Sequence, residues 1–409
     1  DGEAADDAGV DESGEPTLDR AARHFEISGQ RRDRSPPVVA EAGQQSAVEI
    51  IKGDRHAQNV VDAEQSDDQL GRRSALLPLC VSGKTLHDDT MTAAAVDTPT
   101  VAHDSAEPQA PSAVLMVRPH HYRFNAADCA DNAFLVEPDL SGDALAGAAF
   151  DEITAMAHAI EARGVRVELV DDLGTSTPDS VFPNNWFSTH ADGTLVLYPM
   201  RAPSRRLERR PDIVETLKAS YAVNRVLDLS AAEQEGRFLE GTGAMVLDHV
   251  GRHAYVARSG RTDEGLLRTF CAEFDFTPVL FDANGPDGAP IYHTNVMMNV
   301  GTDLAMVCLD SIAAQRDRRR VRSLLEGAGR VVIPIDAAQM GDFAGNALEL
   351  AGAQGPLLVM SSRGWASLHA SQRATVEAHV DVLPVDIPAV EHSGGSARCT
   401  LAGIHLIPR

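Results

Sequence analysis

The stretch AMVLDHVGRHAYVARSGRTDEGLLRTFCAEFDFTPVLF, residues 244–281, shows the unit from which the fold can be deduced. Two short apolar runs, at 244–247 and 253–257, predict a pair of strands. Residues 263–274 have the apolar spacing of a helix, and the run at 278–281 predicts a further strand. The unit is therefore strand, strand, helix, strand.

The same order of elements recurs on both sides of this stretch. The other predicted strands are 113–118, 165–170, 194–198, 223–229, 296–300, 304–309, 330–335, 348–350, 357–360, 382–385 and 403–407. The other predicted helices are 144–163, 211–221, 314–326 and 365–379. Recurrence about every 50 to 60 residues indicates a repeated α/β unit. Such units can form the blades of a ring with loops around one central cavity, and an ordinary α/β sandwich is the alternative.

The first 112 residues have a different composition. They contain 22 acidic and 10 basic residues, and Phe25 is their one aromatic residue. A segment of this kind buries too little apolar surface to offset the entropy of ordering it. We expect 1–112 to be a disordered acidic segment and 113–409 to be a single catalytic α/β domain. A folded regulatory domain and an upstream reading-frame artefact are the alternatives for the first segment.

The totals of the chain exclude several classes of protein. A formal net charge of -24 on 409 residues argues against a nucleic acid or an anionic membrane as partner. No apolar run is long enough to span a bilayer. The five cysteines are scattered without a CxxC pair, which predicts neither a zinc site nor a disulfide framework. We expect a cytoplasmic protein, and the sequence leaves a homo-oligomer open.

A cysteine motif lies near the C-terminal end, in SARCTLAGIHL at 396–406. Cys399 follows the glycine-rich turn at 393–396, and such a loop can present a thiol at the rim of a pocket. Arg398 beside it would favour the thiolate, which is the nucleophilic form. A small buried hydrophobe is the alternative interpretation of a lone cysteine.

Four other stretches are too polar for their apolar surroundings: PDSVFPNNW at 178–186, FLEGTGA at 238–244, AYVARSGRTD at 254–263 and IYHTNVMM at 291–298. The amide pair of the first resembles a pocket floor, or a turn with Asx caps. Glu240 in the second could face a cavity or solvent. The arginines of the third could clamp a carboxylate or lie on the surface. His293 in the fourth could be a general acid/base or a core histidine.

Taken in chain order, these motifs resemble one superfamily. The chain from about Val114 onward is similar to the guanidino-group-modifying enzymes, which are arginine deiminases, dimethylarginine hydrolases and amidinotransferases. The branch it resembles most is that of the citrulline-utilisation hydrolases. The resemblance is carried by MVRP at 116–119, FN at 124–125, FPNNW at 182–186, FAGN at 343–346 and the cysteine motif. It implies a five-bladed α/β propeller (pentein) with the active site in its central channel.

The resemblance also implies roles for individual residues. Cys399 would be the nucleophile and His293 the general acid/base. Glu240 would orient the histidine and bind a substrate nitrogen, and Arg261 would anchor the substrate α-carboxylate. No cofactor or metal is implied, since a His-assisted thiol suffices for this covalent chemistry.

The chain departs from relatives that act on arginine-like cations. These place a carboxylate where Asn185 stands, often with a second acid or another polar residue where Asn184 stands. Asn295 stands where many deiminases have an acid. A guanidinium is a permanent cation that suits carboxylates, whereas a neutral ureido group suits amides, which both donate and accept. We therefore expect these three asparagines, with Asp179 and Arg398, to bind a small amino-acid substrate such as citrulline.

The expected reaction is attack of the Cys399 thiolate on the ureido carbon of citrulline. Ornithine would leave, and water would hydrolyse the carbamoyl thioester to ammonia and carbon dioxide. An arginine or methylarginine deiminase and an amidinotransferase are the rival enzymes. A propeller that only binds a ligand is the non-enzymatic alternative.

Overall fold

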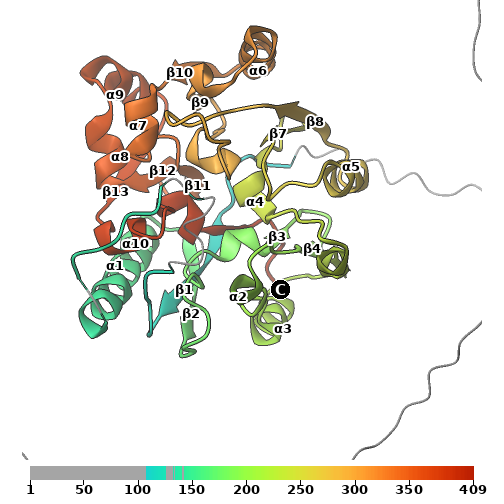
Figure 1. Cartoon of the computed structure of the whole chain (residues 1–409), viewed down its shortest axis with the longest axis vertical. Coiled ribbons are helices and arrows are strands. Elements are labelled where there is room, and N and C mark those ends of the chain that lie inside the picture. Colours follow the sequence, from blue (N-terminus) through green and yellow to red (C-terminus); the bar gives the residue numbers. More distant parts are fainter. Residues whose placement is uncertain (1–106, 126–131, 133, 141) are drawn as a thin grey trace, which may run out of the picture. The chain divides into compact units, whose positions relative to one another are not determined.

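The computed structural model describes residues 107–125, 132, 134–140 and 142–409 (Figure 1). The prediction of disorder for 1–112 therefore lies outside the described residues, except at 107–112. Those six residues contact the rest of the described chain. The amide of Gln109, for example, donates to the carbonyl oxygens of Leu247 and Val300, each at 3.0 Å. The contacting chain thus begins before residue 113.

The described strands form five separate sheets. They are β1 (Ala113–Pro119), β2 (Arg166–Asp172), β3 (Phe187–Thr189), β4 (Thr194–Leu197), β5 (Arg225–Asp228), β6 (Val246–Asp248), β7 (His253–Ala257), β8 (Thr277–Phe281), β9 (Leu304–Val307), β10 (Val331–Pro334), β11 (Leu348–Gly352), β12 (Gly355–Ser361), β13 (Asp381–Val385) and β14 (Ala402–Ile404). Their orders are β14-β1-β2, β3-β4-β5, β6-β7-β8, β9-β10 and β11-β12-β13.

The α-helices of the described chain are α1 (Asp143–Glu161), α2 (Pro203–Arg206), α3 (Pro211–Ser220), α4 (Gly241–Ala244), α5 (Glu264–Glu273), α6 (Gln315–Gly327), α7 (Ala337–Gly341), α8 (Ser362–Ser367), α9 (Ala370–Glu377) and α10 (Pro388–Glu391). Short 3-10 turns are η2 (Pro183–Asn185), η3 (Ser230–Glu235), η4 (Thr294–Val296), η5 (Leu309–Ser311) and η6 (Ala397–Thr400). None of these helices is long and apolar enough to cross a membrane.

The predicted order of strand, strand, helix, strand is present. In β6-β7-β8 the first pair is antiparallel and the second parallel, with α5 between β7 and β8. The sheets containing β4, β12 and β1 follow the same rule. A parallel connection needs a crossover, which the helix supplies. The chain is therefore an α/β protein built from one recurring unit.

The short helices α2, α7 and α10 were not predicted, and three further sequence-based assignments differ from the structure. The strand expected at 296–300 is replaced by η4 and one isolated bridge from Met298 to Val307. The helix expected at 365–379 is split into α8 and α9, because Leu368 is extended and His369 caps the second helix. The sequence analysis did not predict the short strand β3, because its three residues show no apolar period.

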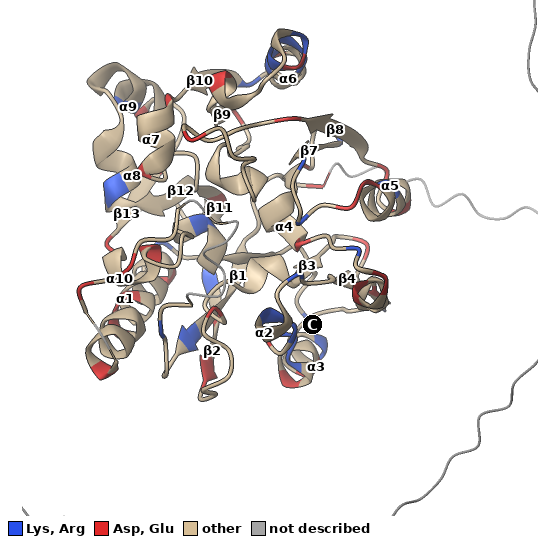
Figure 2. Cartoon of the chain, viewed as in Figure 1, with Lys and Arg blue, Asp and Glu red and all other residues tan. Residues whose placement is uncertain are grey.

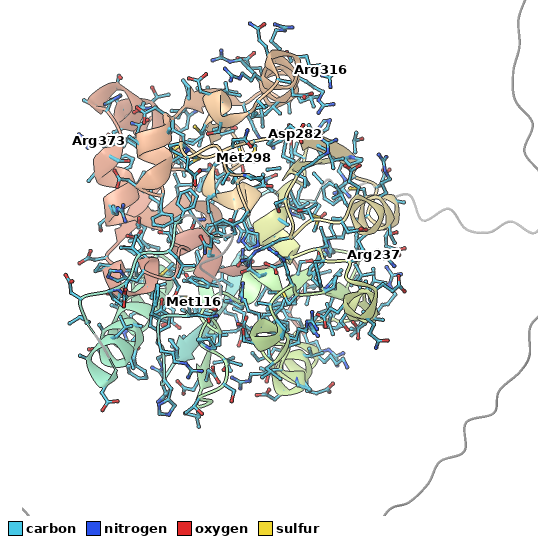
Figure 3. All side chains as sticks on the ribbon, in the orientation of Figure 1. Met116, Arg237, Asp282, Met298, Arg316 and Arg373 are labelled. Carbon is cyan, nitrogen blue, oxygen red and sulfur yellow. The ribbon has the colours of Figure 1, made fainter. Side chains whose placement is uncertain are left out.

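The longer helices lie outside the short strands that start each unit. In Figure 1, α4 lies near the middle of the described chain, while α1, α5, α6 and α9 lie at its outside. Figure 2 shows Lys and Arg residues along α6 and no charged residue on α4 near the middle. Figure 3 shows Met298, which is fully buried, toward the middle, and Arg237, Arg316 and Arg373 toward the outside. Apolar side chains, Met298 among them, form the hydrophobic core between the sheets and these helices.

Five turns precede the first strand of each unit and contact one another. We call them the turn ring: η2, α4, η4, residues 343–346 and η6. α4 contacts η2 and η4, and η2 contacts η6. Glycines allow these approaches. A Cβ on Gly241, whose φ is +44°, would lie 2.5 Å from the carbonyl oxygen of Asn184, and one on Gly345 would lie 2.7 Å from that of Val296. The ring gathers side chains from all five units.

Candidate active site

Cys399 lies on η6 of the turn ring and is 3% exposed. Its sulfur accepts two N–H donors, from Asn295 Nδ2 at 3.4 Å and from Asn346 Nδ2 at 3.2 Å. Both donors come from neighbouring turns of the ring. Two N–H groups directed at sulfur stabilise negative charge on it, so the environment suits a nucleophilic thiolate.

His293 and Glu240 form a buried pair across two units. His293 Nε2 lies 2.8 Å from Glu240 Oε2. Burial lowers the pKa of His293, and the pairing with Glu240 offsets only part of that effect. Burial opposes ionisation of Glu240 as well, but Arg261 and then His293 outweigh it, and the pKa of Glu240 lies well below its ordinary value. The carboxylate is thus charged and the imidazole neutral, with its proton on Nε2.

Glu240 is held by further donors. Arg261 Nη1 donates to Oε2 at 3.2 Å, and the backbone N–H of Arg201 donates to Oε1 at 3.0 Å. The guanidinium of Arg261 also lies 5.3 Å from the ring centre of Tyr292. These contacts fix the carboxylate, and through it the imidazole plane of His293.

Asn185 is oriented by a buried arginine. Arg205 Nη1 donates to Asn185 Oδ1 at 2.9 Å, and its Nε and Nη2 donate to the two oxygens of Glu208 at 3.1 and 2.9 Å. Arg205 is 3% exposed and Glu208 is 2% exposed. Burial opposes the charge of Arg205, but Glu208 outweighs it and raises the guanidinium pKa above its ordinary value. A fixed cation therefore lies directly behind the amide of Asn185.

These groups converge on one pocket of about 300 Å3, counted with its opening. Its lining residues are Asn132, Asp179, Phe182, Asn185, Arg205, Arg261, Tyr292, His293, Ser393, Gly395 and Cys399. The pocket combines an aromatic wall, a thiol, an imidazole and several polar groups, as small-molecule sites do.

The structure brings together most of the residues that the sequence singled out. Cys399, His293, Asn185, Arg261 and Asp179 line the pocket, and Asp179 Oδ2 accepts from Asn125 Nδ2 at 2.7 Å. Glu240 and Asn295 do not line it but contact His293 and Cys399, respectively.

Besides Asn295, two expected substrate-binding residues do not line the pocket. Asn184 is fully buried in η2. Arg398 lines a different cavity and donates to the carbonyl oxygen of Leu401 at 2.9 Å. The reason is geometric: neighbouring residues of a 3-10 turn point in divergent directions, so Cys399 and Arg398 face different spaces.

Four residues at the site were not assigned a role from the sequence. They are Asn132, Arg205, Tyr292 and Asn346. Asn346 lay within the quoted FAGN motif. Arg205 had one signal, the i, i+3 spacing to Glu208 after a proline that starts a helix, which predicts an ion pair but not its place in a pocket.

The chain is an α/β fold of recurring units with a buried thiol, imidazole and carboxylate where the units meet. The family model described as "N,N dimethylarginine dimethylhydrolase, eukaryotic" matches residues 118–406. The chain belongs to this family. It is thus a hydrolase acting on C–N bonds of guanidino-type compounds.

Solved structures show the same fold at low identity. The N-terminal domain of ArgZ, a cyanobacterial arginine dihydrolase, is 18% identical with a TM-score of 0.57, and the match covers 72% of this chain and 99% of that domain. Unliganded AgrE is 18% identical with a TM-score of 0.56, covering 71% of this chain and 38% of AgrE.

A dimethylarginine dimethylaminohydrolase carrying an S-methyl-L-thiocitrulline adduct is 14% identical, with a TM-score of 0.51. That match covers 73% of this chain and 100% of the neighbour. No curated protein sequence matches the chain.

Proposed function

We propose that this protein hydrolyses the ureido group of citrulline to ornithine, ammonia and carbon dioxide through a covalent thioester on Cys399. The observation that carries the proposal is the fixed orientation of the Asn185 amide. The reacting group of citrulline is neutral. The pocket offers it the N–H donor of the Asn185 amide, whose oxygen is held by the Arg205 guanidinium.

The orientation follows from the chemistry of Arg205. A guanidinium has donors and no acceptor, so the atom of Asn185 that it contacts at 2.9 Å is the amide oxygen. The amide nitrogen of Asn185 is then on the other side, buried and without a hydrogen-bond partner among the described residues. It adjoins His293: a Cβ on Gly243 would lie 2.2 Å from Asn185 Nδ2 and 2.9 Å from His293 Nδ1.

A donor in this position suits a carbonyl oxygen. The ureido group of citrulline has such an oxygen, and it becomes negative when the thiolate attacks the carbon. A preorganised donor aimed at that charge is typically worth about 3 kcal/mol. A guanidinium has no carbonyl oxygen, and its permanent charge would be repelled by Arg205 behind Asn185.

The proposed reaction uses residues of the pocket in order. Neutral His293 takes the thiol proton, and the Cys399 sulfur bonds to the ureido carbon. His293 returns the proton to the δ-nitrogen, the C–N bond breaks and ornithine leaves. Water, deprotonated by His293, then cleaves the carbamoyl thioester, and the released carbamate gives ammonia and carbon dioxide. Arg261 is the proposed anchor for the substrate α-carboxylate.

The proposal also includes a propeller architecture and a cellular location. We take the five sheets as the blades of a five-bladed propeller, with the turn ring at its centre and 113–409 as the catalytic domain. The scattered cysteines favour a cytoplasmic location.

Arginine dihydrolysis is the second candidate, because ArgZ is described as an arginine dihydrolase. Two carboxylates support it: Asp179 lines the pocket and Glu240 lies behind His293. In that reaction arginine would yield ornithine, two ammonia molecules and carbon dioxide.

The test is a product assay with citrulline and arginine in parallel, following ornithine and ammonia. Ornithine from citrulline alone is expected. Ornithine from arginine at a comparable rate would replace the first candidate with the second. Citrulline accumulating from arginine would identify a deiminase. Cys399→Ser should abolish turnover while the circular dichroism spectrum stays unchanged.

Two matched alanine variants test the role of Asn185. Asn185→Ala should lower kcat about 10²- to 10³-fold, the usual effect of removing one such donor. Asn184→Ala removes the neighbouring amide, which does not line the pocket, and should lower kcat far less. Equal losses in the two variants would show that Asn185 has no special place in the reaction.

A further inference from the structure

A second cavity lies apart from the catalytic pocket and shares no lining residue with it. Its volume is about 590 Å3, counted with its opening. Its lining includes the strands that start the units, such as β3 and β6, and it contains His249, His405 and Gln109. Glu107, two residues before Gln109, contacts both histidines.

The three side chains converge on a small volume. One ligand-type atom from each of Glu107, His249 and His405 lies within 4.8 Å of the other two. His249 Nδ1 is 3.1 Å from Glu107 Oε2, and His405 Nδ1 is 3.9 Å from Glu107 Oε1. The two imidazoles are stacked with centroids 4.3 Å apart. The residues come from three distant parts of the chain.

One ion pair does not account for the whole convergence. The side chains of His249 and His405 are 7% and 9% exposed. His249 Nδ1 lies 3.1 Å from Glu107 Oε2 and pairs with it, whereas His405 Nδ1 lies 3.9 Å from Glu107 Oε1 and has no hydrogen-bond partner among the described residues. Buried polar atoms are normally hydrogen-bonded, so a second imidazole nitrogen left facing the same carboxylate needs an explanation.

The carboxylate is held as metal-ligating carboxylates are. Arg252 Nη1 donates to Glu107 Oε2 at 3.0 Å, and the backbone N–H of Ala191 donates to Oε1 at 3.2 Å. Outer partners of this kind fix a ligand in place. The charge of Arg252 also weakens cation binding, so the affinity should be moderate.

We propose that Glu107, His249 and His405 bind one divalent transition-metal ion, with zinc as the best fit. Two imidazole nitrogens and one carboxylate are a common protein ligand set for zinc, with the fourth position open. The adjoining cavity would provide that position and a path of entry. The site would tie the segment at 107 to β6 through His249 and to β14 through His405. This site is separate from the proposed thiol chemistry, which needs no metal. The sequence analysis predicted no zinc site because it considered cysteine spacing, and this site uses no cysteine.

The test measures zinc and cobalt binding by the full chain. Purified protein is stripped with a chelator, and binding is followed by calorimetry and by the visible spectrum of Co²⁺. Cys399→Ser serves as the background, because a zinc ion can also bind the catalytic thiol. A thiolate-to-cobalt charge-transfer band in the unsubstituted protein would report that other location.

One ion per chain is expected in Cys399→Ser. His249→Gln, His405→Gln and Glu107→Gln on that background should each weaken binding by at least about tenfold, since each removes one of three ligands. His253→Gln changes a histidine on the adjacent strand β7 that is outside the cluster, and it should bind as the background does. In chains that keep Cys399, the cluster variants should retain turnover, which also shows that they fold.

Two results would overturn the proposal. One is a Cys399→Ser chain that binds no zinc or cobalt. The other is binding that the three cluster variants leave unchanged. Neither result bears on the citrulline reaction, because the proposed thiol chemistry uses no metal and its product assay can be run on the same chelator-treated protein.

Discussion

Two buried arginine–carboxylate pairs have nearly the same chemistry and different surroundings. Arg330 donates to both oxygens of Asp248 at 2.7 and 2.9 Å, and its Nε donates to the carbonyl oxygen of Gly301 at 2.7 Å. Arg205 also donates to both oxygens of Glu208, but its remaining Nη1 donates to Asn185 at the pocket. The first pair joins two units of the fold, and the second orients a pocket side chain.

The comparison shows what a buried ion pair is used for. Desolvation of two charges offsets most of their attraction, so such a pair is weak evidence of a stability gain. Its consistent effect is to fix geometry, because a guanidinium fork places its partners within narrow limits. In Arg330 those limits set the docking of strands. In Arg205 they set which atom of the Asn185 amide points away from the guanidinium.

The largest effect is expected for Arg330→Met, which leaves Asp248 charged and unpaired where both side chains are fully buried. The free energy of unfolding should fall by about 3–5 kcal/mol. Urea unfolding measures this. The double variant Arg330→Met/Asp248→Leu should recover much of the loss, and turnover by the folded fraction should stay near that of the unsubstituted protein. If Arg330→Met lowered kcat and left the free energy of unfolding unchanged, this expectation would be wrong.

Arg205→Lys should separate the two pairs further. A single ammonium cannot serve Glu208 and Asn185 together, so the amide of Asn185 loses its fixed orientation. A misplacement of about 1 Å can cost about 10²-fold, and we expect kcat for citrulline to fall by that order. The unfolding free energy should fall less than in Arg330→Met, because a positive charge remains beside Glu208. An unchanged kcat would place Arg205 among purely structural residues.

The pH dependence tests the charge state next to this network. Burial holds the pKa of His293 below its ordinary 6.5, while Glu240 raises it. The proposed reaction starts from neutral His293, so kcat/KM should fall on the acid side only below about pH 6.5. Glu240→Gln removes the group that raises the pKa, and the acid limb should move lower as the rate falls. If the acid limb of Glu240→Gln moved to higher pH instead, Glu240 would not be the group that raises the pKa of His293.

The smallest effect is expected for an exposed pair, Arg118 with Asp171, at 2.7 Å and 23% and 43% exposed. The hydrogen bond from Arg118 lowers the pKa of Asp171 from 3.8 to about 2. Asp171→Asn should cost at most about 1 kcal/mol at pH 7. Because a depressed carboxyl pKa stabilises only the ionised form, the difference should disappear as the pH falls from about 4 to 2. If Asp171→Asn lowered the free energy of unfolding as much as Arg330→Met does, burial would not determine how much an ion pair matters for stability.

The sequence predicted the outer elements of the units better than the inner ones. The elements α5 and β7 have long or alternating apolar patterns, and their bounds agree with the prediction within a residue. The inner strand β3 has three residues after a turn, too few to show a period. The expected strand at 296–300 is apolar because it is buried, which periodicity alone cannot distinguish from strand pairing.

The site was predictable where chemistry is local and unpredictable where it depends on packing. A thiol, an imidazole and a carboxylate in motif order pointed to Cys399, His293 and Glu240. Arg205 owes its role to an amide twenty residues away, so no local pattern announces it. Glu107 belongs by composition to the acidic segment, and only the fold brings it to His249.

The antiparallel pairing of β14 with β1 joins Ala113 to Ile404, the most distant partners in the described sheets. Cys399, the proposed nucleophile, lies on the turn just before β14, so we expect it to reach its place only when this pairing forms. Contacts between such distant residues form slowly, because the chain entropy is lost before the contact is gained. Catalytic activity should therefore recover more slowly during refolding than the circular dichroism signal of the helices. The time course of turnover then measures how fast β14 pairs with β1.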